Sequence, residues 1–167
     1  GYIFFTTGLI DYFRNLKVIA WTTLIFGLLL FFADRSQIKR NLDTNLNYKN
    51  ILIVGLFQVL AIIPGVSRSG IVITASRFLS FDRVDSSKIA FYLSIPALAG
   101  ASFLGIKKIL ETSTNFNLIF LISIIFSFFI SYLTIKYFLI YVKKFDLKFF
   151  VYYRIFLALI LFVIIYS

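Results

Sequence analysis

The apolar positions of the chain form four long runs and one pair of short runs, separated by polar segments. The long runs occupy residues 18–33, 89–106, 118–136 and 149–166. With their flanks they approach the roughly 20 residues that a helix needs to cross a hydrocarbon core about 30 Å thick. We therefore predict four transmembrane helices, the second of which is expected to be capped by Asp85 or Ser86.

The two short runs, residues 51–63 and 71–79, are separated by a Pro-, Gly- and Ser-rich break. A helix of residues 51–63 is only about 20 Å long, which is too short to cross the membrane. Pro64 stops it, because proline lacks an amide hydrogen and clashes with the preceding turn. Irregular backbone at membrane depth is tolerated where protein or a wet cavity satisfies it. The pattern over residues 51–79 predicts a re-entrant pair of half-helices.

Composition supports a membrane protein. Of the 167 residues 60% are hydrophobic and 20% aromatic, against about 45–50% apolar residues in soluble domains. We predict an all-α integral membrane protein, a multi-span helical bundle forming one membrane domain over residues 1–167. The sequence contains no Cys and no His, which excludes disulfides, zinc–thiolate sites and a histidine base.

The chain contains no Met, so we expect its native start to lie upstream and the domain to be incomplete at its N-terminus. Residues 1–13 are apolar but short. They are expected to be the tail of an interrupted helix or an interfacial segment.

The net charge of +10 has to be read by position. Threading the predicted helices puts the loops 34–50, 80–88 and 138–148 on one side, where they carry nine Lys and Arg residues against four on the other side. Positive loops stay in the cytoplasm. We therefore predict that residues 64–70 point toward the outer face, and we expect no nucleic-acid partner.

The break at residues 64–70 reads PGVSRSG and has the chemistry of a phosphate site. Arginine presents a planar fork of donors that suits phosphate oxygens, and the start of the second half-helix presents free amides. Glycines allow close approach, and serine hydroxyls add donors. The residues that would contribute are Gly65, Ser67, Arg68, Ser69 and Gly70. Two alternatives stay open: a structural hinge in which Arg68 snorkels or pairs with a carboxylate, and an ion or transport path.

Other polar residues of the apolar segments have structural and functional interpretations. Arg77 would contact a phosphate or a partner, or form a structural pair. Arg154 would snorkel, brace the fold or act in the site. Ser94 is expected to satisfy backbone freed by Pro96, and Arg83 to be a loop charge that sets orientation.

Residues 55–70, GLFQVLAIIPGVSRSG, closely resemble the second signature of the bacterial undecaprenyl-diphosphate phosphatases, the bacitracin-resistance family. The similarity continues through Arg83, residues 91–96 (FYLSIP) and the Tyr153–Arg154 pair. It covers essentially the whole chain, which looks like the C-terminal three-fifths or so of a member.

The resemblance implies a hydrolase of the bacterial inner membrane that removes the terminal phosphate of undecaprenyl diphosphate and so recycles the lipid carrier for peptidoglycan. It also implies an inverted repeat whose two re-entrant pairs meet at a site open to the periplasm. Arg68 would bind the diphosphate and stabilise charge during transfer, with Ser67 and Ser69 in support. The expected partners are a polyprenyl diphosphate lipid, the bilayer and a second copy in a homodimer. A broken-helix transporter or lipid flippase is the alternative.

The chain departs from the family in one respect: the first family motif, rich in Glu and accompanied by Ser and His, lies upstream. The resemblance implies a divalent cation, Mg or Ca, whose ligands are not in this chain, so we assign no metal ligand and expect the chain alone to be inactive. Gln58 stands where the first repeat has an acid, and either bonds across the repeat interface or only packs. The acidic residues all fall in or near predicted loops: Asp11, Asp34, Asp43, Asp82, Asp85, Asp146 and Glu111.

Overall fold

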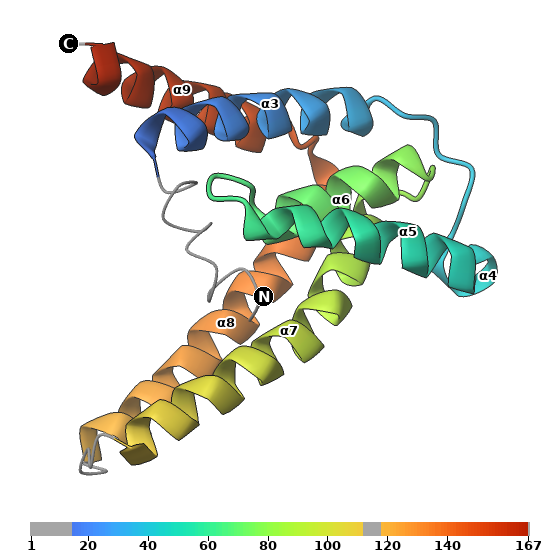
Figure 1. The fold of residues 1–167 in the computed structure, drawn as a ribbon. Helices are drawn as coiled ribbons and strands as arrows, with labels where there is room; N and C mark the ends of the chain where they lie inside the picture. The colour runs from blue at the N-terminus through green and yellow to red at the C-terminus, as the bar shows by residue number, and fades with distance from the viewer. Residues whose placement is uncertain (1–14, 112–117, 167) are drawn as a thin grey trace. The chain divides into compact units, whose positions relative to one another are not determined.

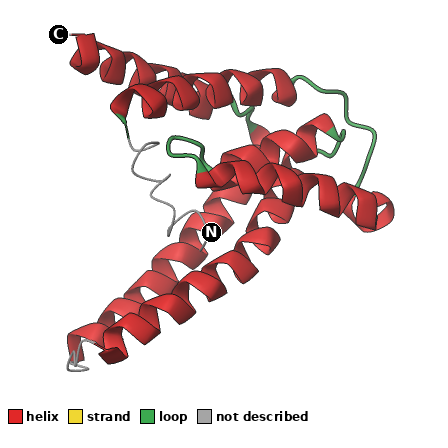
Figure 2. Cartoon of the chain, in the orientation of Figure 1, coloured by secondary structure: helices red, strands yellow, loops and turns green. Residues whose placement is uncertain are grey.

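The computed structural model describes residues 15–111 and 118–166, which form helices joined by short turns (Figure 1, Figure 2). Within these ranges there is no strand, and the predicted all-α class is confirmed. The predicted segment 1–13 lies outside the described residues. The α-helices are α3 (Leu16–Asp34), α4 (Leu42–Asn45), α5 (Tyr48–Val59), α6 (Arg68–Phe78), α7 (Arg83–Glu111), α8 (Leu118–Lys144) and α9 (Lys148–Tyr166), with a 3-10 turn, η1 (Leu60–Ile62), after α5.

Four of these helices, α3, α7, α8 and α9, are long and apolar enough to cross a membrane, as expected of a multi-pass membrane protein. The helix α7 begins at Arg83, whereas the sequence predicted a loop up to residue 88. The reason is a cap at Asp82, whose Oδ1 accepts the amide hydrogen of Asp85 at 2.7 Å. The predictions of a cap at Asp85 or Ser86 and of a loop over residues 83–88 were therefore wrong.

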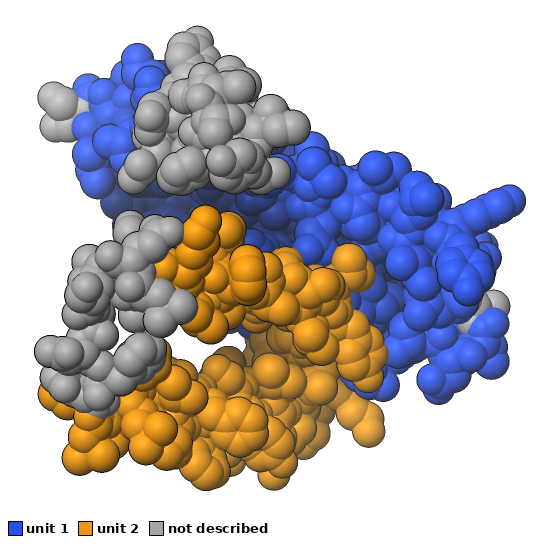
Figure 3. Space-filling view, turned by 60° about the horizontal axis from the view of Figure 1, so that its bottom comes forward, with its two compact units in different colours: residues 1–90, 146–167 blue, residues 91–145 orange. Residues whose placement is uncertain are grey.

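The chain divides into two compact units, residues 1–90 with 146–167 and residues 91–145 (Figure 3). The second unit contains α8 and the part of α7 that follows Ala90. Within it the rings of Phe91 and Phe138 meet edge to face, with 5.8 Å between their centroids. The first unit contains the 64–70 segment, and the site is built there.

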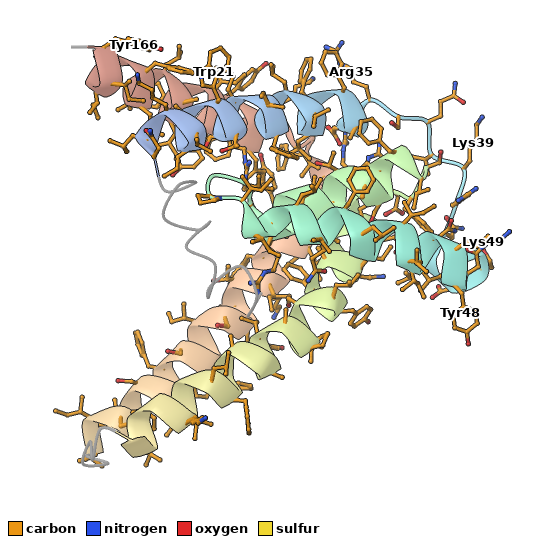
Figure 4. All side chains as sticks on the ribbon, viewed as in Figure 1. Trp21, Arg35, Lys39, Tyr48, Lys49 and Tyr166 are labelled. Carbon is orange, nitrogen blue, oxygen red and sulfur yellow. The ribbon has the colours of Figure 1, made fainter. Side chains whose placement is uncertain are left out.

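In the first unit, α3 and α9 pack side by side and antiparallel (Figure 1). Near one end the ring of Trp21, labelled in Figure 4, lies 5.1 Å from that of Phe162. Near the other end the amide of Leu147 donates to Asp34 Oδ2 at 3.2 Å. Between them Gly27 lets the helices approach closely, because a Cβ there would lie 3.2 Å from a side-chain carbon of α9.

The helices α5 and α6 form a hairpin with its turn at residues 63–67 (Figure 1). The 3-10 turn η1 ends at Ile62, and Pro64 prevents a helical continuation. Helix α6 packs against both α5 and α3, and every residue from Ile71 to Arg77 is buried. The hairpin therefore holds α6 inside the first unit, with only the start and end of the helix near its surface.

Two contacts with α3 fix how far this hairpin reaches. At its turn Thr22 Oγ1 donates to the carbonyl of Pro64 at 2.7 Å, and at the far end of α6 Arg77 Nη2 donates to the carbonyl of Asp34 at 2.8 Å. Thr22 and Asp34 are twelve residues apart, or roughly 18 Å along the helix. Helix α3 has 19 residues, about 28 Å, so the turn stops roughly 9 Å short of its first residue. The hairpin is therefore shorter than the membrane-length helix α3 beside it, and that residues 51–79 form a re-entrant pair stays a prediction.

The polar segments predicted to share one side of the membrane are hydrogen-bonded to one another. The amides of Lys39 and Arg40 donate to the carbonyl of Ser80 at 3.0 and 3.1 Å. The amide of Leu42 donates to Asp85 Oδ2 at 2.8 Å. Together with the Leu147–Asp34 bond, these contacts gather the three segments at one end of α3, away from the turn of the hairpin.

Candidate functional site

The turn of the hairpin depends on a glycine. Gly65 has a φ of +89°, in the left-handed region that residues with a Cβ rarely adopt. A Cβ at this position would overlap Thr22 Oγ1 and lie 2.8 Å from the carbonyl oxygen of Ile19. Both the backbone conformation and the close approach to α3 therefore require glycine at position 65.

Helix α6 starts at Arg68 and not at residue 71 as predicted, because Ser67 caps it. Ser67 Oγ accepts the amide hydrogen of Gly70 at 3.2 Å and lies 3.3 Å from Ser69 Oγ. The first intrahelical bond runs from the amide of Ile71 to the carbonyl of Ser67 at 2.9 Å. The amides of Arg68 and Ser69 precede it, so helix geometry leaves both as donors for another group.

The side chains of Arg68 and Ser69 are exposed. Together with their amides and the positive end of the helix dipole, they form a surface suited to an anion. We call residues 64–70 the anion cradle. Its geometry supports the phosphate interpretation more directly than the hinge, since Arg68 has no carboxylate partner among the described residues.

A second arginine reaches the anion cradle from α9. Nη2 of Arg154 lies 3.2 Å from the position that a Cβ of Gly70 would occupy, and Ser67 Oγ is equally close to that position. Its stem passes Gly27 of α3, where an added Cβ would lie 3.2 Å from Arg154 Cβ. Arg154 is thus directed into the packed unit at the depth of Gly27, which does not match a snorkelling side chain.

Arg154 makes no hydrogen bond or ion pair with any residue in 15–111 or 118–166. A guanidinium at membrane depth is costly unless an anion or carbonyl groups compensate it. An anion held by the amides of Arg68 and Ser69 would supply that compensation. The two arginines and the helix start therefore provide positive charge and donors for a phosphate group.

The opposite end of α6 carries a buried cluster around Asp34. Its carboxylate accepts Nε and Nη2 of Arg83 at 2.7 and 2.9 Å, and the amide of Leu147 at 3.2 Å. The sequence interpretation placed Asp34 in or near a loop and took Arg83 for a loop charge, and so missed this pair. The position of Asp34 directly after an apolar run could have marked it as a buried acid, but it does not identify Arg83 as the partner.

Arg77 belongs to the same cluster. It is buried, and its guanidinium donates to the carbonyls of Phe81, Asp34 and Ser36 at 2.5, 2.8 and 2.8 Å. Burial lowers the pKa of Arg77 from its ordinary value, and the Asp34 carboxylate, 3.7 Å from Nε, opposes that shift. Of the two interpretations of Arg77, the structural pair fits these contacts, and the residue lies far from the anion cradle.

The remaining candidates are Gln58 and Ser94. Gln58 lies half-buried in α5, before the 3-10 turn. Ser94 belongs to the second unit, and its Oγ donates to the carbonyl of Phe91 at 2.6 Å. Pro96 frees the carbonyl of Tyr92, four residues before it, whereas Ser94 bonds the carbonyl of Phe91. The prediction that Ser94 satisfies the backbone freed by Pro96 was therefore wrong.

The described residues do not fit a divalent cation. Among them no three His, Cys, Asp or Glu side chains come together. Asp34, the buried acid, is engaged by Arg83, Arg77 and a backbone amide. What the described residues can do is bind and neutralise an anion.

The sequence model of the family described as bacitracin resistance protein BacA matches residues 1–160 of the chain. The chain is 55% identical over 168 residues to an undecaprenyl-diphosphatase of Pelagibacter ubique. The aligned region covers 100% of the chain and 66% of that relative. It is 42% identical to the undecaprenyl-diphosphatase of Elusimicrobium minutum over 89% of the chain and 56% of the relative. It is 38% identical to the undecaprenyl-diphosphatase of Saccharophagus degradans over 93% of the chain and 59% of the relative.

The chain thus spans 56 to 66% of the length of these relatives. The match to the family extends over nearly all of the chain and includes α3, α6 and the first part of α9, which build the anion cradle and bring Arg154 to it. The chain belongs to the BacA family of bacitracin resistance proteins.

Proposed function

We propose that the full-length protein hydrolyses undecaprenyl diphosphate to undecaprenyl phosphate and phosphate, recycling the lipid carrier of cell-wall synthesis. The observation that carries this proposal is the anion cradle with Arg154 beside it, set within the length of a membrane helix. A lipid diphosphate has its phosphates at the membrane surface and its chain in the bilayer, so it suits such a site. The relatives named undecaprenyl-diphosphatase support the same substrate.

In the proposed reaction water attacks the terminal phosphorus, the bond to the bridging oxygen breaks, and undecaprenyl phosphate leaves. Catalysis of phosphoryl transfer consists mainly of positioning and charge stabilisation. Arg68 would hold phosphate oxygens through two parallel N–H bonds, and the amides of Arg68 and Ser69 would take a further oxygen. Ser69 and the cap Ser67 would support this geometry. Arg154 would balance charge from the other side of Gly70.

The proposal includes a divalent cation, with ligands outside the described residues, and we assign it no step here. It also includes an inner-membrane location, with the anion cradle facing the periplasm. The orientation rests on the excess of Lys and Arg at the Asp34 end of α3, where the polar segments meet. That the protein works as a homodimer remains a prediction.

The test is phosphate release from undecaprenyl diphosphate by the purified full-length protein. Arg68→Ala is expected to lower kcat by about 100-fold or more, because a preorganised donor at the transferring group is lost. Arg68→Lys should fall between, since it keeps the charge and loses the fork. The matched control is Arg35→Ala, an exposed arginine at the other end of α3 that stacks on Phe31 at 4.1 Å, which should leave kcat unchanged.

Unchanged release by Arg68→Ala would remove Arg68 from the site. If the parent protein released no phosphate but moved labelled undecaprenyl diphosphate between leaflets, the flippase alternative would replace the hydrolase.

A further inference from the structure

Two threonines of α3 bond outside their own helix. Thr23 Oγ1 lies 3.5 Å from the carbonyl oxygen of Gly65, and Thr22 makes the shorter bond. Oγ1 of Thr22 lies 2.7 Å from the carbonyl oxygen of Pro64, which is 42 residues away in sequence, and 2.8 Å from the carbonyl oxygen of Val18 in its own helix. Thr74 and Thr134, in other helices, donate to carbonyls four residues earlier at 2.7 and 2.8 Å. Thr22 therefore has an acceptor in the cradle that an ordinary helical threonine lacks.

The hydroxyl has one hydrogen and three carbonyls within reach, because the carbonyl oxygen of Ile19 also lies 3.1 Å away. The carbonyls do not need the hydrogen equally, and that of Ile19 is the normal helical acceptor for the amide of Thr23. The carbonyl of Val18 is the normal acceptor for the amide of Thr22 in an α-helix, so it remains satisfied without the hydroxyl. Pro64 precedes a left-handed residue, and its carbonyl is outside regular helix. Leaving a half-buried carbonyl without a donor destabilises the folded protein. The hydrogen bond from Thr22 therefore stabilises the fold most when it is made to Pro64.

We propose that Thr22 is a positioning residue for the anion cradle, a role that rests on the proposed function. Its hydrogen bond holds the Pro64 carbonyl against α3 and so fixes the left-handed turn at Gly65. That turn sets where Ser67 caps α6 and where the amides of Arg68 and Ser69 point. Arg154 reaches the cradle from α9, which packs on the same helix α3. By holding the cradle against α3, Thr22 therefore fixes the amides of Arg68 and Ser69 in position relative to the Arg154 guanidinium.

The experiment compares Thr22→Val, Thr22→Ala and Thr22→Ser in the full-length protein, with Thr134→Val as the matched control. The control removes an exposed threonine hydroxyl whose acceptor is in its own helix. Three quantities are measured for each folded variant: kcat/KM for phosphate release from undecaprenyl diphosphate, the Tm, and the hydrogen exchange rates of the amides of residues 65–70.

We expect Thr22→Val and Thr22→Ala to lower kcat/KM by about 10- to 100-fold, the range that a displacement of about 1 Å produces. The exchange rates of the 65–70 amides should rise in both. Thr22→Ser keeps the hydroxyl and should restore both values, and Thr134→Val should not change them. A role in stability alone would lower the Tm and leave kcat/KM of the folded protein intact, which would overturn the proposal.

Two other results would overturn it as well. If Thr22→Val is slow and Thr22→Ala is normal, the cause is a methyl group crowding the Pro64 carbonyl. If Thr22→Ser is as slow as Thr22→Ala, the hydroxyl is not the agent. Should the parent protein release no phosphate, the proposed function fails, while the exchange rates still decide whether Thr22 orders the cradle.

Discussion

The cluster around Asp34 leads to a quantitative prediction for Asp34→Asn. In the parent protein the carboxylate takes two hydrogen bonds from Arg83 and one from the amide of Leu147. Asparagine keeps the shape of the side chain but has one acceptor oxygen in place of two. Its NH2 group would face the N–H donors of Arg83 or Leu147, with which it cannot form a hydrogen bond. The bonds join the end of α3 to the starts of α7 and α9, so the change should loosen three helices at once.

The magnitude follows from the burial of the two partners. Removing one member of a buried pair costs about 3–5 kcal/mol. The side chain of Asp34 is 6% exposed but that of Arg83 is 33% exposed, so water recovers part of the loss and we expect about 2–3 kcal/mol. For a protein of this size each kcal/mol lowers the Tm by about 2–4 °C. The Tm should therefore fall by about 4–12 °C.

The assay is thermal unfolding of the full-length protein in detergent, with Asp43→Asn, an exposed acid in α4, as the control that should not shift. Arg83→Gln and the double variant complete a cycle. The two single effects should not add, because either change breaks the same pair. A Tm for Asp34→Asn within 1 °C of the parent, or strictly additive effects, would refute the argument.

Two further predictions concern the anion cradle. Gly65→Ala should abolish most phosphate release and lower the Tm, because a left-handed alanine costs about 1–2 kcal/mol and its Cβ would lie 2.8 Å from the carbonyl oxygen of Ile19. The control is Gly55→Ala, whose added Cβ has no atom within 4 Å, and equal effects of the two changes would contradict the role of the turn. Arg154→Leu should lower kcat by about 100-fold without lowering the Tm, since it removes a charge with no partner among residues 15–111 and 118–166; a fall in Tm with normal kcat would make Arg154 a brace and not a site residue.

The sequence was sufficient to locate the apolar helices and the cradle, because both are local patterns: run length decides the first, and a Pro-Gly break with Arg and Ser decides the second. The helix starts were harder, since several capping residues stand close together. Ser67 and Asp82 cap α6 and α7, where the pattern favoured later positions.

Long-range pairs could not be predicted from local patterns. The approach of Arg154 to Gly70 depends on how α9 packs on α3, and the Asp34–Arg83 bond joins residues 49 apart in sequence. Nothing near either residue in sequence specifies its partner. The first contact appears only once the antiparallel register of α3 and α9 is known, and the second only once the start of α7 is placed against the end of α3.

The packing of Arg154 against two glycines affects how an anion would bind. Gly27 lies close to Cβ and Cδ of this half-buried side chain and Gly70 close to its Nη2, so α3 and α6 restrict the arginine at both ends. Ordering an arginine side chain costs up to about 2 kcal/mol of rotamer entropy. Here folding has already ordered the side chain, so a ligand meets a preorganised guanidinium and keeps that free energy as affinity.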